Sequence, residues 1–152
     1  MARRVPQYTL GRARRRMEPA AIGIAQVNAA SFPKAARLVR DCLSRQGLTI
    51  VAEQSADGSG RTLCVVCPFL LFETLAFDAS AAVFVPARVA MRPSPLGAEV
   101  RWLTAAAFLP VRLAAGGVGP VQALHERIGA AIRTLEKRRR MFLFRPRRRN
   151  EG

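Results

Sequence analysis

Two cysteines stand close together in the stretch RTLCVVCPFLLFETLAFD, and their spacing raises the question of thiol chemistry. Cys64 and Cys67 form a Cys-x-x-Cys pattern, with Pro68 directly after it. Such a pair is reactive when both sulfurs sit at a helix N-terminus, where backbone amides stabilise a thiolate. Three interpretations follow: a redox pair, half of a metal site, or a buried strand that runs into a helix.

The position of Pro68 favours the strand that runs into a helix. Proline is preferred at the first position of a helix, so Cys67 is expected near the N-cap and Cys64 in the preceding strand. Residues three apart on a strand point to opposite faces and lie about 10 Å apart, whereas a disulfide needs Cα atoms within about 7 Å. A zinc site needs about four ligands, and the chain offers one histidine and one further cysteine, the distant Cys42. We therefore expect free thiols, no metal and no cofactor.

Three other features carry weaker signals of chemistry. His125 falls on or beside the apolar stripe of a C-terminal helix without an assignable partner, which favours a structural role. Glu73 lies in the apolar stretch FLLFETLAF; it would be a catalytic candidate if buried, but a solvated or capping carboxylate is more common there. The segment GGVGP lacks the spacing and the lysine of a phosphate-binding loop, which favours a hinge.

Hydrophobic periodicity predicts the elements that must position these residues. Apolar residues at helical spacing indicate a helix capped by Ser31 and stopped by Gly47, and a final helix with a stripe from Val121 to Leu135. The consecutive strands near the middle favour an antiparallel or mixed sheet over a doubly wound one. The expected order is β-α-β-β-α-β-β-α, with strands near 20–28, 48–54, 63–66, 83–91 and 98–104, and helices near 31–46, 68–77 and 121–140.

Alternation along two of these strands predicts which side chains share a face. One side of the later strand is expected to carry Val83, Val85, Ala87, Val89 and Met91, opposite Arg88 and Arg92. Pro86 predicts an edge strand or a bulge, and RPSPLG predicts a hairpin with a longer loop. In the earlier strand, Leu48, Ile50 and Ala52 are expected on one side.

Positive charge is concentrated at the two ends of the 152-residue chain, whose formal net charge is +15. Residues 1–20 carry net +5 and residues 137–152 net +7, which leaves net +3 for 21–136. We expect a basic flexible arm at 1–18, one α+β domain at 19–141 and a basic tail at 142–152. Basic ends imply an anionic partner. The residues expected to contact it are Arg12, Arg14, Arg15, Arg16, Lys137, Arg138, Arg139, Arg140, Arg145, Arg147, Arg148 and Arg149.

The anionic partner could be nucleic acid or an acidic membrane surface. In KRRRMFLFRPRRR, arginines could neutralise phosphates while Phe142 and Phe144 stack on bases, or MFLF could enter the membrane interface. Packing of MFLF onto the core, as a continuation of the last helix, remains a third option. No apolar run reaches the ~18 residues that a spanning helix needs. We therefore expect a cytoplasmic protein, with peripheral membrane attachment and a homodimer left open.

The order of blocks resembles the domain of unknown function 302 (DUF302) family over residues 22–136. The blocks are SFPKAARLVRDCLSRQGLTIVAE, LCVVCPFLLFETLAFD, AAVFVPARVAM and a terminal amphipathic helix. The resemblance implies a curved, mainly antiparallel sheet with helices on one face, similar to the TATA-binding-protein fold, and it implies no reaction. Val66 and Ala87 stand where the family has cysteines, while Pro86 and Arg88 match its pattern.

Two functions are compatible with these features. The leading one is a non-enzymatic binding or accessory domain that its Arg-rich ends hold on a polyanion. The alternative is a small-molecule or enzymatic site in the cleft between sheet and helices, lined by Cys67, Glu73 and Arg88. No nucleophile–base pair can be named in the sequence, so a binding role is favoured over catalysis.

Overall fold

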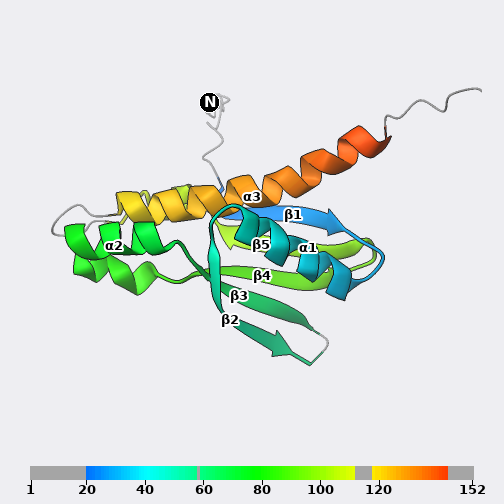
Figure 1. The fold of residues 1–152 in the computed structure, drawn as a ribbon, viewed down its shortest axis with the longest axis horizontal. Coiled ribbons are helices and arrows are strands. Elements are labelled where there is room, and N and C mark those ends of the chain that lie inside the picture. Colours follow the sequence, from blue (N-terminus) through cyan, green and yellow to red (C-terminus); the bar gives the residue numbers. More distant parts are fainter. Residues whose placement is uncertain (1–19, 58, 112–117, 144–152) are drawn as a thin grey trace, which may run out of the picture.

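A curved, open sheet of five antiparallel strands forms the centre of the protein (Figure 1). The computed structural model describes residues 20–57, 59–111 and 118–143. The spatial order is β1-β5-β4-β3-β2, so β4 is the middle strand and β1 and β2 are the edges. The strands are β1 (Ile22–Asn28), β2 (Thr49–Ala56), β3 (Gly60–Val66), β4 (Ala87–Ser94) and β5 (Gly97–Leu103).

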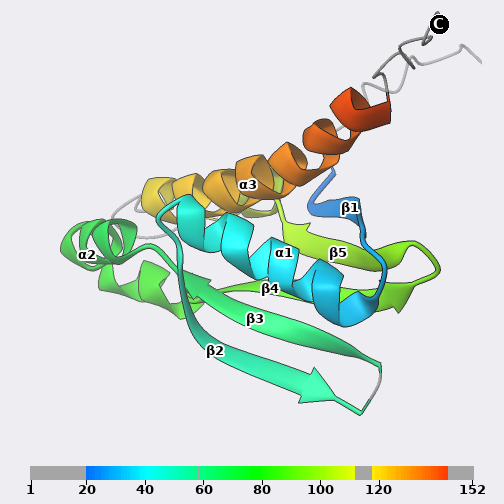
Figure 2. The ribbon, with the colours of Figure 1, turned by 45° about the vertical axis from the view of Figure 1, so that its right-hand side comes forward.

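Two long helices, α1 (Phe32–Arg45) and α3 (Gly119–Leu143), lie over one face of this sheet, as Figures 1 and 2 show from two sides. A shorter helix, α2 (Pro68–Phe77), lies beside the start of α3. The predicted fold class and element order are therefore confirmed. None of the described helices is long and apolar enough to cross a bilayer.

The core lies between the sheet and α1 and α3, and strand alternation decides which residues enter it. In β4, Ala87, Val89 and Met91 are buried, whereas Arg88 and Arg92 on the opposite face are exposed. The predicted stripe of α3 meets this core. Its members Val121, Leu124, Ile128 and Ile132 are buried, and Leu135 packs against the cluster while partly exposed.

Helix α1 begins and ends where local sequence signals place it. The Ser31 side chain accepts a hydrogen bond from the backbone N–H of Lys34 at 3.4 Å, which satisfies one otherwise free amide of the first turn. Gly47 has a φ of 74°, a conformation that glycine adopts without steric cost. Both predicted boundaries are confirmed.

The prediction that a strand begins at Val83 was wrong. Residues Ala79–Phe84 form a short 3-10 helix, η1, and Val83 is 79% exposed. The side chain of Asp78 accepts from the backbone N–H of Ser80, which stabilises this turn locally. Strand pairing also starts only at Ala87, because its partner strand β3 ends just beyond, where the chain enters α2.

Three further strand details differ from expectation. Pro86 precedes β4, the central strand, so it marks neither an edge nor a bulge within that strand. The β4–β5 hairpin is tight, since Ser94 pairs with Gly97 and two residues form the loop. A register shift between Ile50 and Ala52 breaks the alternation of β2, which leaves Ala52 exposed.

The two chain ends fall largely beyond the described residues. The expected arm at 1–18 lies outside them, as do residues 144–152 of the expected tail. Helix α3 is described to Leu143, two residues past the domain end expected at 141.

Candidate functional site

A cavity of about 320 Å³ opens at one end of the sheet, where η1, β4 and α3 meet. This volume is within the range of pockets that hold small molecules. Most of its lining residues are apolar, and the three polar ones are Cys64, Arg88 and His125. The lining residues are Cys64, the segment Val83–Arg88, Leu103, His125 and Phe108 of the short 3-10 helix η2 (Ala105–Phe108).

One wall of the cavity is a row across three neighbouring strands. Cys64 of β3 pairs with Arg88 of β4, and the β4–β5 register, with Val89 opposite Trp102, sets Arg88 beside Leu103 of β5. Because successive side chains along a strand point to opposite faces, these three side chains lie on the face of the sheet opposite α1 and α3, which we call the helix-free face. Directly opposed residues have Cβ atoms about 5 Å apart, so the side chains of Cys64 and Arg88 begin side by side. Arg88 is exposed and makes no ion pair with any described residue.

His125 closes the cavity from α3. Its side chain is 2% exposed, and its Nδ1 lies 3.0 Å from the carbonyl oxygen of Leu103. Because a carbonyl only accepts, Nδ1 carries the hydrogen and donates it. Burial lowers the pKa of His125, and the bond to Leu103 opposes that effect less strongly. The imidazole is therefore neutral near pH 7, which leaves Nε2 as an acceptor.

The Nε2 atom of His125 is buried and has no hydrogen-bond partner within the described part of the chain. The ring packs against that of Phe108, with centroids 4.7 Å apart, and Phe108 in turn meets the edge of Phe84. A buried polar atom without a partner costs about 1–3 kcal/mol. Within the described ranges, the site thus combines a buried acceptor without a hydrogen-bond partner, a cation without an ion pair, a thiol and aromatic walls.

Three chains of known structure match the fold. The fold resembles the crystal structure of an uncharacterized conserved DUF302 protein from Bacillus stearothermophilus, with a TM-score of 0.63 and 12% identity. The match covers 76% of this chain and 98% of that one. The two chains share a fold. The resemblance to DUF302 that the sequence predicted is confirmed at this level. No family model and no curated protein matches the sequence.

Within this DUF302-like fold, only Arg88 of the predicted set Cys67, Glu73 and Arg88 lines the cavity of about 320 Å³. Arg88 lies in the cavity described above, but Cys67 and Glu73 do not line it. Cys67 is the N-cap residue of α2, as predicted, and is buried. The Nη1 group of Arg127 on α3 donates to its sulfur at 3.5 Å. Glu73 is half-buried in α2.

The sequence did not predict that Cys64 and His125 line the same cavity as Arg88. It placed Cys64 correctly in the strand, as a free thiol on the opposite side from Cys67, and it left His125 as a structural residue. The register of β3 against β4 places Cys64 beside Arg88, and the packing of α3 over the end of β5 brings His125 to the same place. Among the described residues, no group of three or more His, Cys, Asp or Glu side chains could hold a metal ion.

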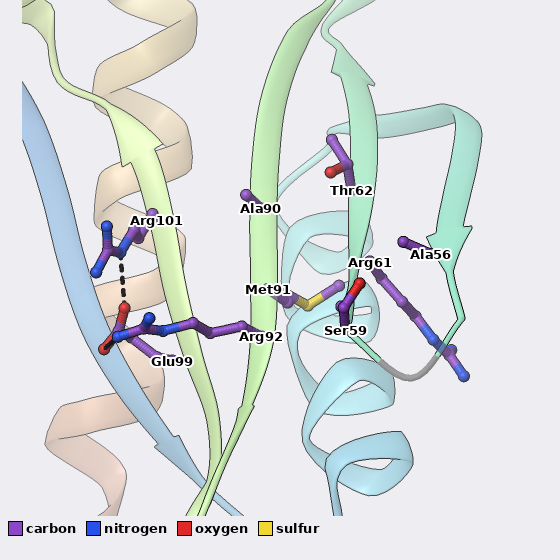
Figure 3. Close-up of a pocket in the computed structure, with 10 residues that line it drawn as sticks. Ala56, Ser59, Arg61, Thr62, Ala90, Met91, Arg92, Glu99 and Arg101 are labelled. Atoms are coloured by element: carbon purple, nitrogen blue, oxygen red, sulfur yellow. Dashed lines mark hydrogen bonds and ion pairs between the residues drawn. The ribbon is translucent and has the colours of Figure 1, made fainter.

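A second hollow of about 310 Å³ lies further along the helix-free face, near the turn between β2 and β3 (Figure 3). Each of its charged side chains has an ion-pair partner, which for Arg61 is Glu53, outside the lining. Glu99 accepts from Arg92 at 2.9 Å and from Arg101 at 2.6 Å. These hydrogen bonds, from Arg92 first and Arg101 second, hold the pKa of Glu99 below its usual value. Arg88 in the first cavity has no such partner among the residues that the structure describes, which makes the first cavity the better candidate for an anionic ligand.

The residues expected to bind a polyanion lie outside the described side chains. Helix α3 carries the backbone of Lys137, Arg138, Arg139 and Arg140 in its final turns. Arg12, Arg14, Arg15 and Arg16 precede the first described residue, and Arg145, Arg147, Arg148 and Arg149 follow the last.

Proposed function

We propose that this protein is a non-enzymatic binding domain that holds a small organic anion in the cavity between Arg88 and His125. The observation that carries the proposal is the buried Nε2 of His125, which lacks a hydrogen-bond partner in the described chain and belongs to a residue that lines the same cavity as Arg88. Because Nε2 is buried, a ligand reaches it only when the imidazole rotates toward the cavity; a hydrogen bond donated to Nε2 there would remove the cost of leaving that atom unsatisfied.

The chemistry of the walls defines the ligand class. Arg88 calls for a carboxylate or a similar planar anion, because its guanidinium donates in a fork that matches such groups. Neutral His125 calls for a hydroxyl or amine donor. The apolar part of the wall consists of Phe84, Leu103 and Phe108. The part of the ligand between its anionic group and its hydrogen-bond donor is therefore expected to be apolar or aromatic. The ligand is therefore a small aromatic or aliphatic acid that also carries a hydrogen-bond donor.

The simplest probe with all three features is 4-hydroxybenzoate. We expect it to bind with a dissociation constant of about 1 mM or lower, which corresponds to roughly −4 kcal/mol. Benzoate, which lacks the donor, should bind several-fold more weakly, because Nε2 stays unsatisfied. The measurement is a titration followed by NMR chemical shifts, with the largest changes expected near His125 and Arg88.

Arg88→Gln is the decisive variant, and Arg92→Gln is its matched control. Loss of a charged hydrogen bond costs about 1.5–3 kcal/mol, so Arg88→Gln should weaken binding by roughly ten- to a hundredfold. Arg92 stands four residues further along the same strand and on the same face, but it is bound to Glu99, so its removal should leave affinity unchanged. Equal affinity in both variants, or no binding of the probe by the wild-type chain, would refute the proposal.

Alkylation of Cys64 provides an independent readout. Its side chain is half-exposed and lines the same cavity, so bound probe should slow its reaction with iodoacetamide. Unchanged protection kinetics at saturating probe would show that the probe binds elsewhere.

A second candidate function is association with a polyanion through the basic ends. The observation that favours it is the distribution of charge, with net +5 in residues 1–20 and net +7 in residues 137–152. Such ends would neutralise phosphates and release counterions, which makes affinity strongly dependent on salt. Nucleic acid and an acidic membrane remain the two possible partners.

The test of this second function is a salt titration of the full chain with duplex DNA, RNA and anionic vesicles. Replacing Arg145, Arg147, Arg148 and Arg149 by Gln should reduce the slope of log affinity against log salt by up to about 3.6 on duplex DNA. The same four changes to Lys keep the charge and should leave the slope nearly unchanged. No binding of the wild-type chain to any of the three partners at low salt would exclude this function.

A further inference from the structure

Helix α2 has the sequence of a buried helix but is only partly covered. In PFLLFETLAF, apolar residues occur on every side of the helix, and a helix of this kind normally lies inside a protein. The fold buries only Leu70 and Thr74 of it. The remaining large side chains form a surface that we call the α2 face, which consists of Phe69 (66% exposed), Phe72 (72%), Leu75 (48%), Phe77 (67%) and, from the adjacent η1, Val83 (79%).

The α2 face is large enough to form most of an interface. Phe69, Phe72 and Leu75 follow one another at three-residue spacing, so they form a continuous ridge. Three phenylalanines that are each about two-thirds exposed offer roughly 400 Å², and the two smaller residues raise this to roughly 600 Å². A standard interface buries about 800 Å² on each partner, so a modest rim around the α2 face completes it.

Charge argues against a membrane as the occupant. Amphipathic helices that lie on membranes carry Lys and Arg on their polar side. The whole stretch 62–87 contains no Lys or Arg, and its only charges are the acidic Glu73 and Asp78. The feature that does match the α2 face is another apolar surface of the same size.

We propose that the α2 face is the contact surface of a homodimer, in which it packs against the same surface of a second copy. A two-fold axis would bring the ridges of both copies together and bury roughly 1,200 Å² of apolar surface in total, the lower limit of specific interfaces. Val83 belongs both to this face and to the wall of the cavity, so the second copy lies next to the ligand site.

The experiment is the mass of the full chain in solution, by sedimentation equilibrium over a range of concentrations. Roughly 0.5 M NaCl shortens the Debye length to about 4 Å, which suppresses repulsion between the basic ends and bridging by nucleic acid. We expect a species of twice the 16.6 kDa chain mass, with a micromolar or tighter dissociation constant.

Phe72→Glu should abolish the dimer, because symmetry places two unpaired carboxylates in one apolar contact. We expect the dissociation constant to rise by about a hundredfold or more. The side chain is largely exposed, so circular dichroism and the melting transition of the monomer should stay intact. Phe69→Glu provides a second disruption of the same ridge. Leu38→Glu on α1, which is 43% exposed, is the matched control and should remain dimeric.

Three results would overturn the proposal. The wild-type chain could be monomeric throughout the range. Phe72→Glu and Phe69→Glu could both stay as dimeric as the wild type. Finally, a monomeric wild-type chain could sediment with neutral or anionic vesicles and lose this property on Phe72→Glu, which would assign the α2 face to a membrane.

Discussion

Between pH 6.5 and 5.5, acid should destabilise this protein through His125. Its pKa in the folded protein lies below the ordinary value of 6.5, because the ring is buried and protonation would place a charge where Nε2 finds no partner among the described groups. As pH falls below 6.5, His125 therefore becomes protonated in the unfolded chain, while it stays neutral in the folded chain. The free energy of unfolding is fully maintained above pH 6.5 and decreases below it, until the folded form also becomes protonated.

The size of the effect has an upper limit set by one proton. Between pH 6.5 and 5.5, a histidine that stays neutral in the folded state lowers the free energy of unfolding by at most about 1 kcal/mol. For a chain of this length, each kcal/mol corresponds to roughly 2–4 °C in melting temperature. We therefore expect the melting temperature to fall by up to about 4 °C over this pH unit.

The assay is thermal unfolding between pH 5.5 and 7.5, followed by the fluorescence of Trp102, the only tryptophan. Because His125 is the only histidine, no other side chain of the sequence has an ordinary pKa in this range. The ordinary pKa values of Asp and Glu lie below this range, and hydrogen bonds from Arg92 and Arg101 lower the pKa of Glu99. His125→Phe keeps a ring against Phe108 and should flatten the pH dependence.

Two outcomes would refute the reasoning. A melting temperature that rises as pH falls from 6.5 to 5.5 would mean that the folded protein favours the charged imidazole, and thus that an unseen acceptor meets Nε2. A pH dependence that persists in His125→Phe would mean that another group is responsible.

Two further predictions test the packing and the thiols. Gly23→Ala should lower the free energy of unfolding by about 1–3 kcal/mol, because a Cβ there would overlap the ring of Trp102, and calorimetry together with a change in tryptophan emission would report it. In the native protein, Cys64 should react with iodoacetamide well before Cys42 and Cys67, since it alone is only half-buried; mass spectrometry of tryptic peptides gives the order, and early labelling of Cys67 would contradict its burial.

Local signals in the sequence determined the elements and much of the fold class. Ser31 and Gly47 fixed the ends of α1, since capping and left-handed backbone depend on one or two residues. Alternation fixed the buried face of β4. The strand that was expected at Val83 failed because alternation does not report whether a partner strand is present to pair with, and β3 has already ended there.

Tertiary structure alone decided the candidate site. Cys64 and Arg88 become neighbours through the register of β3 against β4, and His125 reaches the carbonyl of Leu103 only when α3 packs over the end of β5. Register and helix placement are set by the fit of many buried side chains across distant segments, which periodicity within one segment does not encode. The sequence contained every residue of the cavity, but their meeting depended on the long-range packing of the core.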